Sequence, residues 1–156
     1  MKQRIDKKIV LLLARIAMGW VFLYAGYSKI IDPSWSAKAY IASAKAFPQF
    51  YQLLLRPDIL PKINVLNEWG LLLIGIALIM GAFVRFASFF GFALMILYYL
   101  PIYPPSQGYI VDMHIIYALL FLIFMIVPVG EIVGLDALFK KTEIARNHGW
   151  FRALLG

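Results

Sequence analysis

The sequence predicts an all-α integral membrane protein, a bundle of four transmembrane helices that forms a single domain over residues 1–156. Hydrophobic residues make up 63% of the chain and the mean hydropathy is +0.81, well outside the range of soluble proteins. The apolar residues gather into four runs that prolines, glycines or charges separate. We also expect an interfacial helix in the first connection and an amphipathic C-terminal tail.

The first span is predicted at about residues 9–31. The segment before it holds four cations, Lys2, Arg4, Lys7 and Lys8, as the charged region of a signal peptide does. The apolar core of a signal peptide is about 7–15 residues long, whereas this run is longer and lacks a small-residue cleavage site. The segment therefore predicts a helix that stays in the membrane.

One face of this helix carries charge at both ends. Arg15, Gly19, Phe22, Gly26 and Lys29 follow the spacing 4, 3, 4 and 3, which is that of a single helix face. An arginine facing lipid at this depth costs about 3 kcal/mol, so we expect Arg15 to face the protein interior and contact an acid or main-chain carbonyls. The glycines allow a neighbouring helix to approach closely.

The connection over residues 32–62 is predicted to hold a short helix on the membrane surface. Asp32 and Pro33 end the first span and favour the start of a helix, which Pro48 then ends. Pro57 and Pro61 predict an irregular return segment. The connection is long enough to cover the bundle as a lid, and an interfacial spacer remains the alternative.

The remaining spans are predicted at about residues 63–83, 86–100 and 109–127. A tight link at Gly81 joins the second span to the third. The third and fourth spans are separated by a segment rich in residues typical of loops, namely Pro101, Pro104, Pro105 and Gly108. After Pro128 the sequence alternates apolar and basic residues, which predicts an amphipathic helix lying on the membrane.

Lysine and arginine counts beside the spans predict the orientation. The tails and the second link carry nine: Lys2, Arg4, Lys7, Lys8, Arg85, Lys140, Lys141, Arg146 and Arg152. The opposite side carries five: Lys29, Lys38, Lys45, Arg56 and Lys62. We therefore expect a multi-pass protein with both termini in the cytoplasm. The membrane we expect is a bacterial or archaeal cell (inner) membrane, as for the family that the chain resembles below.

Four charged or titratable residues fall within about one turn of the predicted outer helix ends: Lys29, Glu68, Asp112 and His114. We expect Lys29 and Glu68 to pair and His114 to border the same pocket. Imidazole changes charge near neutral pH, so this outer cluster has the groups that proton transfer or recognition of a polar headgroup requires. The alternative is that the cluster only holds helices together.

Aromatic residues lie at the same predicted level: Trp69, Tyr98, Tyr99, Tyr103 and Tyr109. Trp69 and Tyr109 are ligand-binding candidates because such rings can stack on a quinone-like ring. An aromatic belt at the membrane interface is the alternative explanation.

The inner side holds a second set of charges, namely Arg15, Arg85, Glu131 and Asp136. We interpret these as structural, with the acids as possible partners of Arg15. No catalytic residue is assigned.

The composition excludes several kinds of chemistry. The chain has no cysteine, which excludes disulfide exchange, thiol nucleophiles and iron–sulfur ligation by this chain. Its two histidines, His114 and His148, are separated by a predicted span, so we expect no metal site and no covalently bound cofactor. The net charge of +7 lies mostly in the tails, which favours anionic lipid headgroups over nucleic acid as the partner.

Three segments in order, RIAMGWVFLYAGYSKIIDP, EWGLLLIGIALIMGAFVR and GLDAL, resemble the DoxX/DoxD-like membrane proteins. The resemblance implies a four-helix membrane bundle, in a family whose archetype is named as a subunit of a thiosulfate:quinone oxidoreductase. Other members are linked to respiratory, sulfur or oxidative-stress complexes. Arg15, Lys29, Glu68 and Asp136 match positions of the family pattern without an assigned role.

Three functions therefore remain open. The first is a membrane subunit of a quinone-linked redox complex that binds a quinone or similar lipophilic molecule near the outer cluster, with membrane lipids, a redox partner subunit and a second copy as possible partners. The second is a non-catalytic assembly or anchoring protein. The third is a small lipophile carrier or lipid-binding protein, although no helix interior has the break typical of a midplane transport site.

Overall fold

The computed structural model describes residues 2–106 and 108–156, and every regular element in these residues is a helix. Three helices are long and apolar enough to cross a membrane: residues Asp6–Ile30 of α1 (Lys2–Ile30), α4 (Leu60–Met80) and α5 (Val84–Ile102). The shorter apolar helix α6 spans Met113–Ile126, which is 14 residues. The predicted all-α class with membrane-spanning helices is confirmed.

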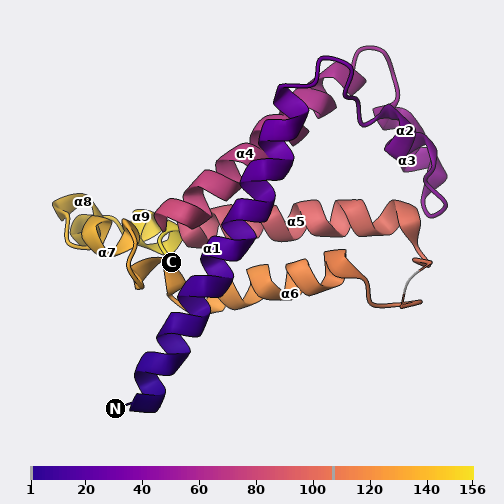
Figure 1. Ribbon diagram of the computed structural model, residues 1–156. Helices are drawn as coiled ribbons and strands as arrows, with labels where there is room; N and C mark the ends of the chain where they lie inside the picture. Colours follow the sequence, from indigo (N-terminus) through magenta and orange to yellow (C-terminus); the bar gives the residue numbers. More distant parts are fainter. Residues whose placement is uncertain (1, 107) are drawn as a thin grey trace.

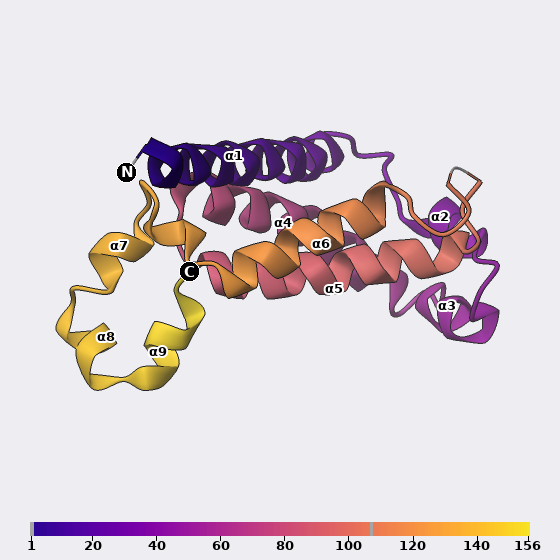
Figure 2. The same ribbon diagram turned by 90° about the horizontal axis from the view of Figure 1, so that it is seen from below.

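The helices α1, α4, α5 and α6 form two antiparallel pairs. α1 packs along α4, and α5 packs along α6. In Figure 1 the two pairs meet at the short α4–α5 link and diverge towards the other end. Figure 2 shows that the C-terminal helices lie at the link, whereas α2 (Lys38–Ala42) and α3 (Pro48–Leu54) lie at the opposite end. We call these the tail end and the hairpin end.

Glycines bring α1 and α4 into backbone contact. A Cβ at Gly26 would lie 2.4 Å from the backbone nitrogen of Leu72, and a Cβ at Gly75 would lie 2.3 Å from that of Leu23. No side chain fits at these separations, so the small residues set the distance between the helices. The predicted contact face of the first helix is confirmed.

The core lies where the two pairs cross. Phe22 of α1 meets Phe121 of α6 edge to face, with ring centroids 5.0 Å apart. The ring of Phe121 also fills the space above Gly91 of α5, where a Cβ would lie 2.3 Å from it. These contacts join both pairs through one aromatic side chain.

The bounds of the second and fourth spans differ from the prediction. Pro61 lies in the first turn of α4, where proline is favoured, so the return segment is shorter than expected. Gly81, with φ of 64°, ends α4 at Met80 rather than at residue 83. α6 begins at Met113 rather than at residue 109 because the Asp112 side chain accepts hydrogen bonds from the first turn.

The first connection folds into two short helices rather than one surface helix, and Pro48 begins α3. The α2–α3 hairpin packs on the end of α5. Pro101 has no N–H to donate to the carbonyl of Leu97, and the Tyr51 hydroxyl donates to that carbonyl instead, at 2.9 Å. The Tyr40 hydroxyl donates to the carbonyl of Tyr98. The hairpin thus satisfies the carbonyl of Leu97, which Pro101 leaves without a helical donor, and adds a second donor at the carbonyl of Tyr98.

The tail is also divided, and the prediction of one amphipathic helix is wrong. After the 3₁₀ turn η1 (Val129–Glu131), the helices α7 (Asp136–Phe139), α8 (Glu143–Asn147) and α9 (Gly149–Leu154) form a loop that returns to the bundle. The backbone N–H of Gly156 donates to Asp136 at 2.8 Å, and Leu155 is fully buried. Because both ends of the tail are anchored at one place, the segment between them cannot extend as a single helix.

Candidate functional site

Arg15 is fully buried at the tail end and makes contact with main-chain carbonyls. Its Nη1 donates to the carbonyls of Val129 at 2.5 Å and Ile132 at 3.1 Å, and its Nη2 donates to that of Val133 at 3.0 Å. Gly81 leaves room for the guanidinium, since a Cβ there would lie 2.8 Å from Nη1. The predicted interior position of Arg15 and its contact with carbonyls are confirmed.

Asp136 holds the start of α5. Its Oδ1 accepts from the backbone N–H of Phe83 at 2.7 Å, and its Oδ2 accepts from Val84 at 3.1 Å and Gly156 at 2.8 Å. A carboxylate at a helix N-terminus satisfies free N–H groups and complements the helix dipole. Asp136 therefore acts as the cap of a helix that is more than fifty residues earlier in the chain.

The two other tail-end charges make separate contacts. Arg85 donates from Nε to the carbonyl of Met125 at 2.8 Å, and Glu131 pairs with Lys140 at the surface. These contacts and those of Arg15 and Asp136 account for the tail-end charges as connections between chain segments.

At the hairpin end, Asp112 and His114 form a pair. The carboxylate Oδ2 lies 2.6 Å from Nδ1 of the imidazole, and Oδ1 accepts from the backbone N–H groups of His114 at 3.0 Å and Ile115 at 3.3 Å. These hydrogen bonds satisfy the carboxylate at the start of α6 and fix the orientation of the imidazole. Because Nδ1 faces Asp112, Nε2 is the ring nitrogen left for a ligand.

Lys29 does not form the predicted ion pair with Glu68 in the described part of the chain. Its Nζ donates to the carbonyl of Ala25 at 3.1 Å and lies 5.3 Å from the centre of the Trp35 ring. The backbone of Glu68 lies against Gly26, one turn from Lys29. The two residues are neighbours, but the ammonium turns back along its own helix and over an aromatic face.

Lys29 and His114 line one cavity of about 160 Å³ between α1, α4, α5 and α6, which we call the central cavity. Two further polar groups border it, Tyr98 and Tyr117. The rest of its wall is apolar and consists of Val21, Phe22, Ala25, Leu71, Met95 and Met113. The prediction that His114 borders a pocket beside Lys29 therefore agrees with the geometry.

Other predicted candidates lie elsewhere. Glu68 and Asp112 do not line the central cavity, and Trp69 and Tyr109 are 50% and 72% exposed, as residues of an aromatic belt are. Tyr117 was not a candidate from the sequence, although it lies three residues after His114 and so on the same helix face.

A second, polar cleft of about 560 Å³ lies next to the central cavity at the hairpin end. Asp112 and His114 line this cleft together with Ser43, Lys45 and the proline-rich loop. His114 borders both the cleft and the central cavity. Its imidazole is thus placed between a polar surface and an apolar interior.

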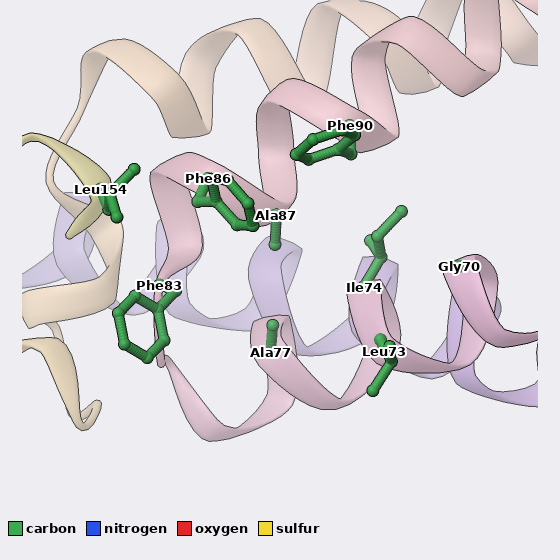
Figure 3. A pocket seen from close by; sticks show the side chains of 9 residues that line it. All are labelled: Gly70, Leu73, Ile74, Ala77, Phe83, Phe86, Ala87, Phe90 and Leu154. Carbon is green, nitrogen blue, oxygen red and sulfur yellow. The ribbon is translucent and has the colours of Figure 1, made fainter. Parts of the chain in front are cut away.

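A third hollow of about 460 Å³ lies between α4 and α5 and is apolar throughout. Figure 3 shows Ala77 of α4 and Ala87 of α5 pointing towards each other in this groove, with Phe86 and Phe90 beside them. No side chain in its wall offers a hydrogen bond, so the groove suits lipid chains and does not select a polar ligand. No group of three histidine, aspartate or glutamate residues that could hold a metal occurs within residues 2–106 and 108–156.

Comparison with known proteins gives one match. A family model described as DoxX matches residues 10–104. The match extends from α1 through α5 and ends before α6 and the GLDAL segment. Searches of curated proteins and of solved structures found no match.

Proposed function

This chain belongs to the DoxX family of membrane proteins, and from that premise we propose that it is the membrane subunit of a quinone-linked redox complex. In this proposal the central cavity binds the ring of a quinone or similar lipophilic molecule. The observation that carries the proposal is that Lys29 and His114 line one cavity whose other wall residues, apart from Tyr98 and Tyr117, are apolar.

The size of the cavity supports a ring-sized ligand. A protein cavity of roughly 150 Å³ holds a benzene ring, and the central cavity measures about 160 Å³. A quinone ring carries two carbonyl oxygens, which require hydrogen-bond donors inside an apolar site. The ammonium of Lys29 supplies one such donor, and Nε2 of His114 supplies another when the imidazole is protonated.

The chemistry follows from the positions of these two groups. Reduction of a quinone to a quinol takes two electrons, which a partner subunit supplies, and two protons. His114 transfers a proton from Nε2 to a reduced oxygen, and Asp112 stabilises the protonated imidazole through Nδ1. The polar cleft on the other side of His114 returns a proton to the imidazole, which then delivers the second proton, while Lys29 stabilises negative charge on the oxygen that is not yet protonated.

The same proposal includes the membrane arrangement. α6 and the apolar residues that flank it form a fourth span, and the short helices α2 and α3 and the basic tail lie at the two membrane surfaces. In this arrangement both termini are in the cytoplasm, which the lysine and arginine counts favour. The hairpin end and the polar cleft then face the outside. The partners in this proposal are membrane lipids, a redox subunit and a second copy of this chain.

A specific observation favours anchoring as the second candidate function. Every charge of the tail end that the sequence singled out contacts another part of this chain, so the tail end is built as a rigid platform. In this alternative the protein holds a partner at the membrane, and the central cavity has no ligand.

The decisive experiment compares ligand binding and thermal stability in one set of variants. Protein in lipid nanodiscs is titrated with a short-chain benzoquinone, and the variants are His114→Gln, Lys29→Met and the exposed control Lys62→Met. We expect the first two to weaken binding about 10-fold, the effect of one charge-assisted hydrogen bond, and the control to bind as the wild type does. Equal binding by all four proteins, with lower melting temperatures for the first two, would support anchoring instead.

A further inference from the structure

A separate small cavity lies under the α2–α3 hairpin and contains one polar group without a partner. This hairpin cavity measures about 130 Å³ and lies between the hairpin and helices α4 and α5. Asn67 of α4 lines it and is 9% exposed. Its Nδ2 donates to the hydroxyl of Tyr98, but its Oδ1 is buried and accepts no hydrogen bond from the described residues.

The other polar atoms in the wall already have partners. The hydroxyls of Tyr40 and Tyr51 donate to carbonyls of α5, and that of Tyr98 accepts from Asn67. The remaining wall is aliphatic, formed by Ala37, Ile41, Leu54, Ile63, Leu66, Leu94 and Leu97. A buried amide oxygen without a hydrogen-bond donor costs free energy, so this site favours a molecule that supplies one hydrogen bond to the amide of Asn67.

The hairpin cavity reaches the exposed apolar surface of α4 and α5. Two of its wall residues, Leu66 and Leu97, are 70% and 44% exposed and belong to neighbouring helices α4 and α5. A ligand dissolved in the membrane can therefore enter between them without displacing the hairpin.

We propose that the hairpin cavity binds a slender apolar molecule that ends in a single hydroxyl group, with the hydroxyl on the amide of Asn67. A hydroxyl is both donor and acceptor, so it satisfies Asn67 whether the free amide atom is Oδ1 or Nδ2. A pure acceptor or a hydrocarbon does not have this property. The ring or chain of the ligand contacts the leucine and isoleucine side chains.

The test measures selectivity for the hydroxyl group. The probes are phenol and benzene, which differ by that group and are small enough for a cavity of about 130 Å³. Each is bound to the protein in nanodiscs, and binding is corrected with protein-free nanodiscs of the same lipid. For the wild type we expect the phenol to bind about 2- to 10-fold more tightly from the lipid phase, as one net hydrogen bond gives. Equal affinity for the two probes in the wild type overturns the proposal.

Variants of Asn67 and Tyr98 test whether the selectivity for the hydroxyl group arises in the hairpin cavity. Asn67→Leu/Tyr98→Phe removes both polar partners together, so we expect equal affinity for the two probes and a melting temperature at or above that of the wild type. Asn67→Leu alone repeats the measurement if the double variant folds poorly. Selectivity that persists in these variants overturns the proposal.

Two controls separate this site from other effects. Asn64 lies one turn away and holds the backbone of Ala37 at 3.0 Å, so Asn64→Leu should lower stability and keep the selectivity. Lys29→Met alters the central cavity only, so the phenol selectivity should survive even where quinone binding is lost. Loss of selectivity in Lys29→Met would overturn the assignment to the hairpin cavity.

Discussion

Replacing Arg15 tests whether a buried cation joins the tail to the first helix. The guanidinium supplies donors to three carbonyls, those of Val129, Ile132 and Val133, and it is fully buried. Arg15→Leu removes these donors and puts an apolar side chain with high helix propensity in their place. Arg15→Glu removes them and adds a carboxylate beside the carbonyl oxygens and near Asp136.

The magnitude follows from the contacts. A buried carbonyl that loses its donor costs about 1–3 kcal/mol, and removal of a buried charge returns part of the total. For Arg15→Leu we expect a net loss of about 2–4 kcal/mol in the free energy of unfolding, or roughly 5–15 °C in melting temperature. For Arg15→Glu we expect more than about 5 kcal/mol, because an unpaired acid then faces acceptors only.

The assay follows the monodisperse fraction of detergent-solubilised protein after heating. Arg85→Leu is the matched control, since Arg85 is partly buried and donates one hydrogen bond at 2.8 Å, and its loss should cost about 1 kcal/mol. The reasoning is refuted if Arg15→Leu has the same melting temperature as Arg85→Leu, or if Arg15→Glu is as stable as Arg15→Leu.

Three further predictions concern other parts of the chain. Asp136→Ala should lower the free energy of unfolding by about 2–4 kcal/mol. Asp136→Asn should lower it by less, because the amide keeps one acceptor oxygen for the three N–H groups. Chemical unfolding in detergent measures both variants, and equal losses would contradict the capping role. Burial, with the nearby Tyr98, Tyr51 and Asp112, raises the pKa of Tyr40 to about 12, so the folded state keeps a proton that the unfolded state loses above about pH 10. The free energy of unfolding should therefore fall between about pH 10 and about pH 12, and the fall should be smaller in Tyr40→Phe. A fall of the same size in Tyr40→Phe and in the wild type would contradict this role of Tyr40. Since the chain has no cysteine, Ser34→Cys and Glu143→Cys can each be labelled with an impermeant maleimide on intact cells, and only Ser34→Cys should react if the termini are cytoplasmic.

The hairpin and tail show where sequence patterns reach their limit. The sequence pattern predicts breaks at Pro48 and Pro61, yet each lies in the first turn of a helix, because proline stops a helix before it and favours the first turn of the next. One contact that holds the hairpin, from the Tyr51 hydroxyl to the carbonyl of Leu97, exists because Pro101 lies four residues later and has no N–H to donate. A local pattern does not say which distant hydroxyl reaches them.

The sequence by itself determined the helical membrane class, the family and the interior face of the first helix. Hydropathy and the 3.6-residue period act within a single segment, so the positions of Arg15 and the α1 glycines followed from spacing alone. Only the tertiary structure decided what these residues contact. The carbonyls around Arg15, the cap that Asp136 gives to α5 and the cavity shared by Lys29 and His114 join segments far apart in the chain. Such contacts depend on how the helix pairs cross, and the crossing is set by many small packing contacts that no single motif encodes.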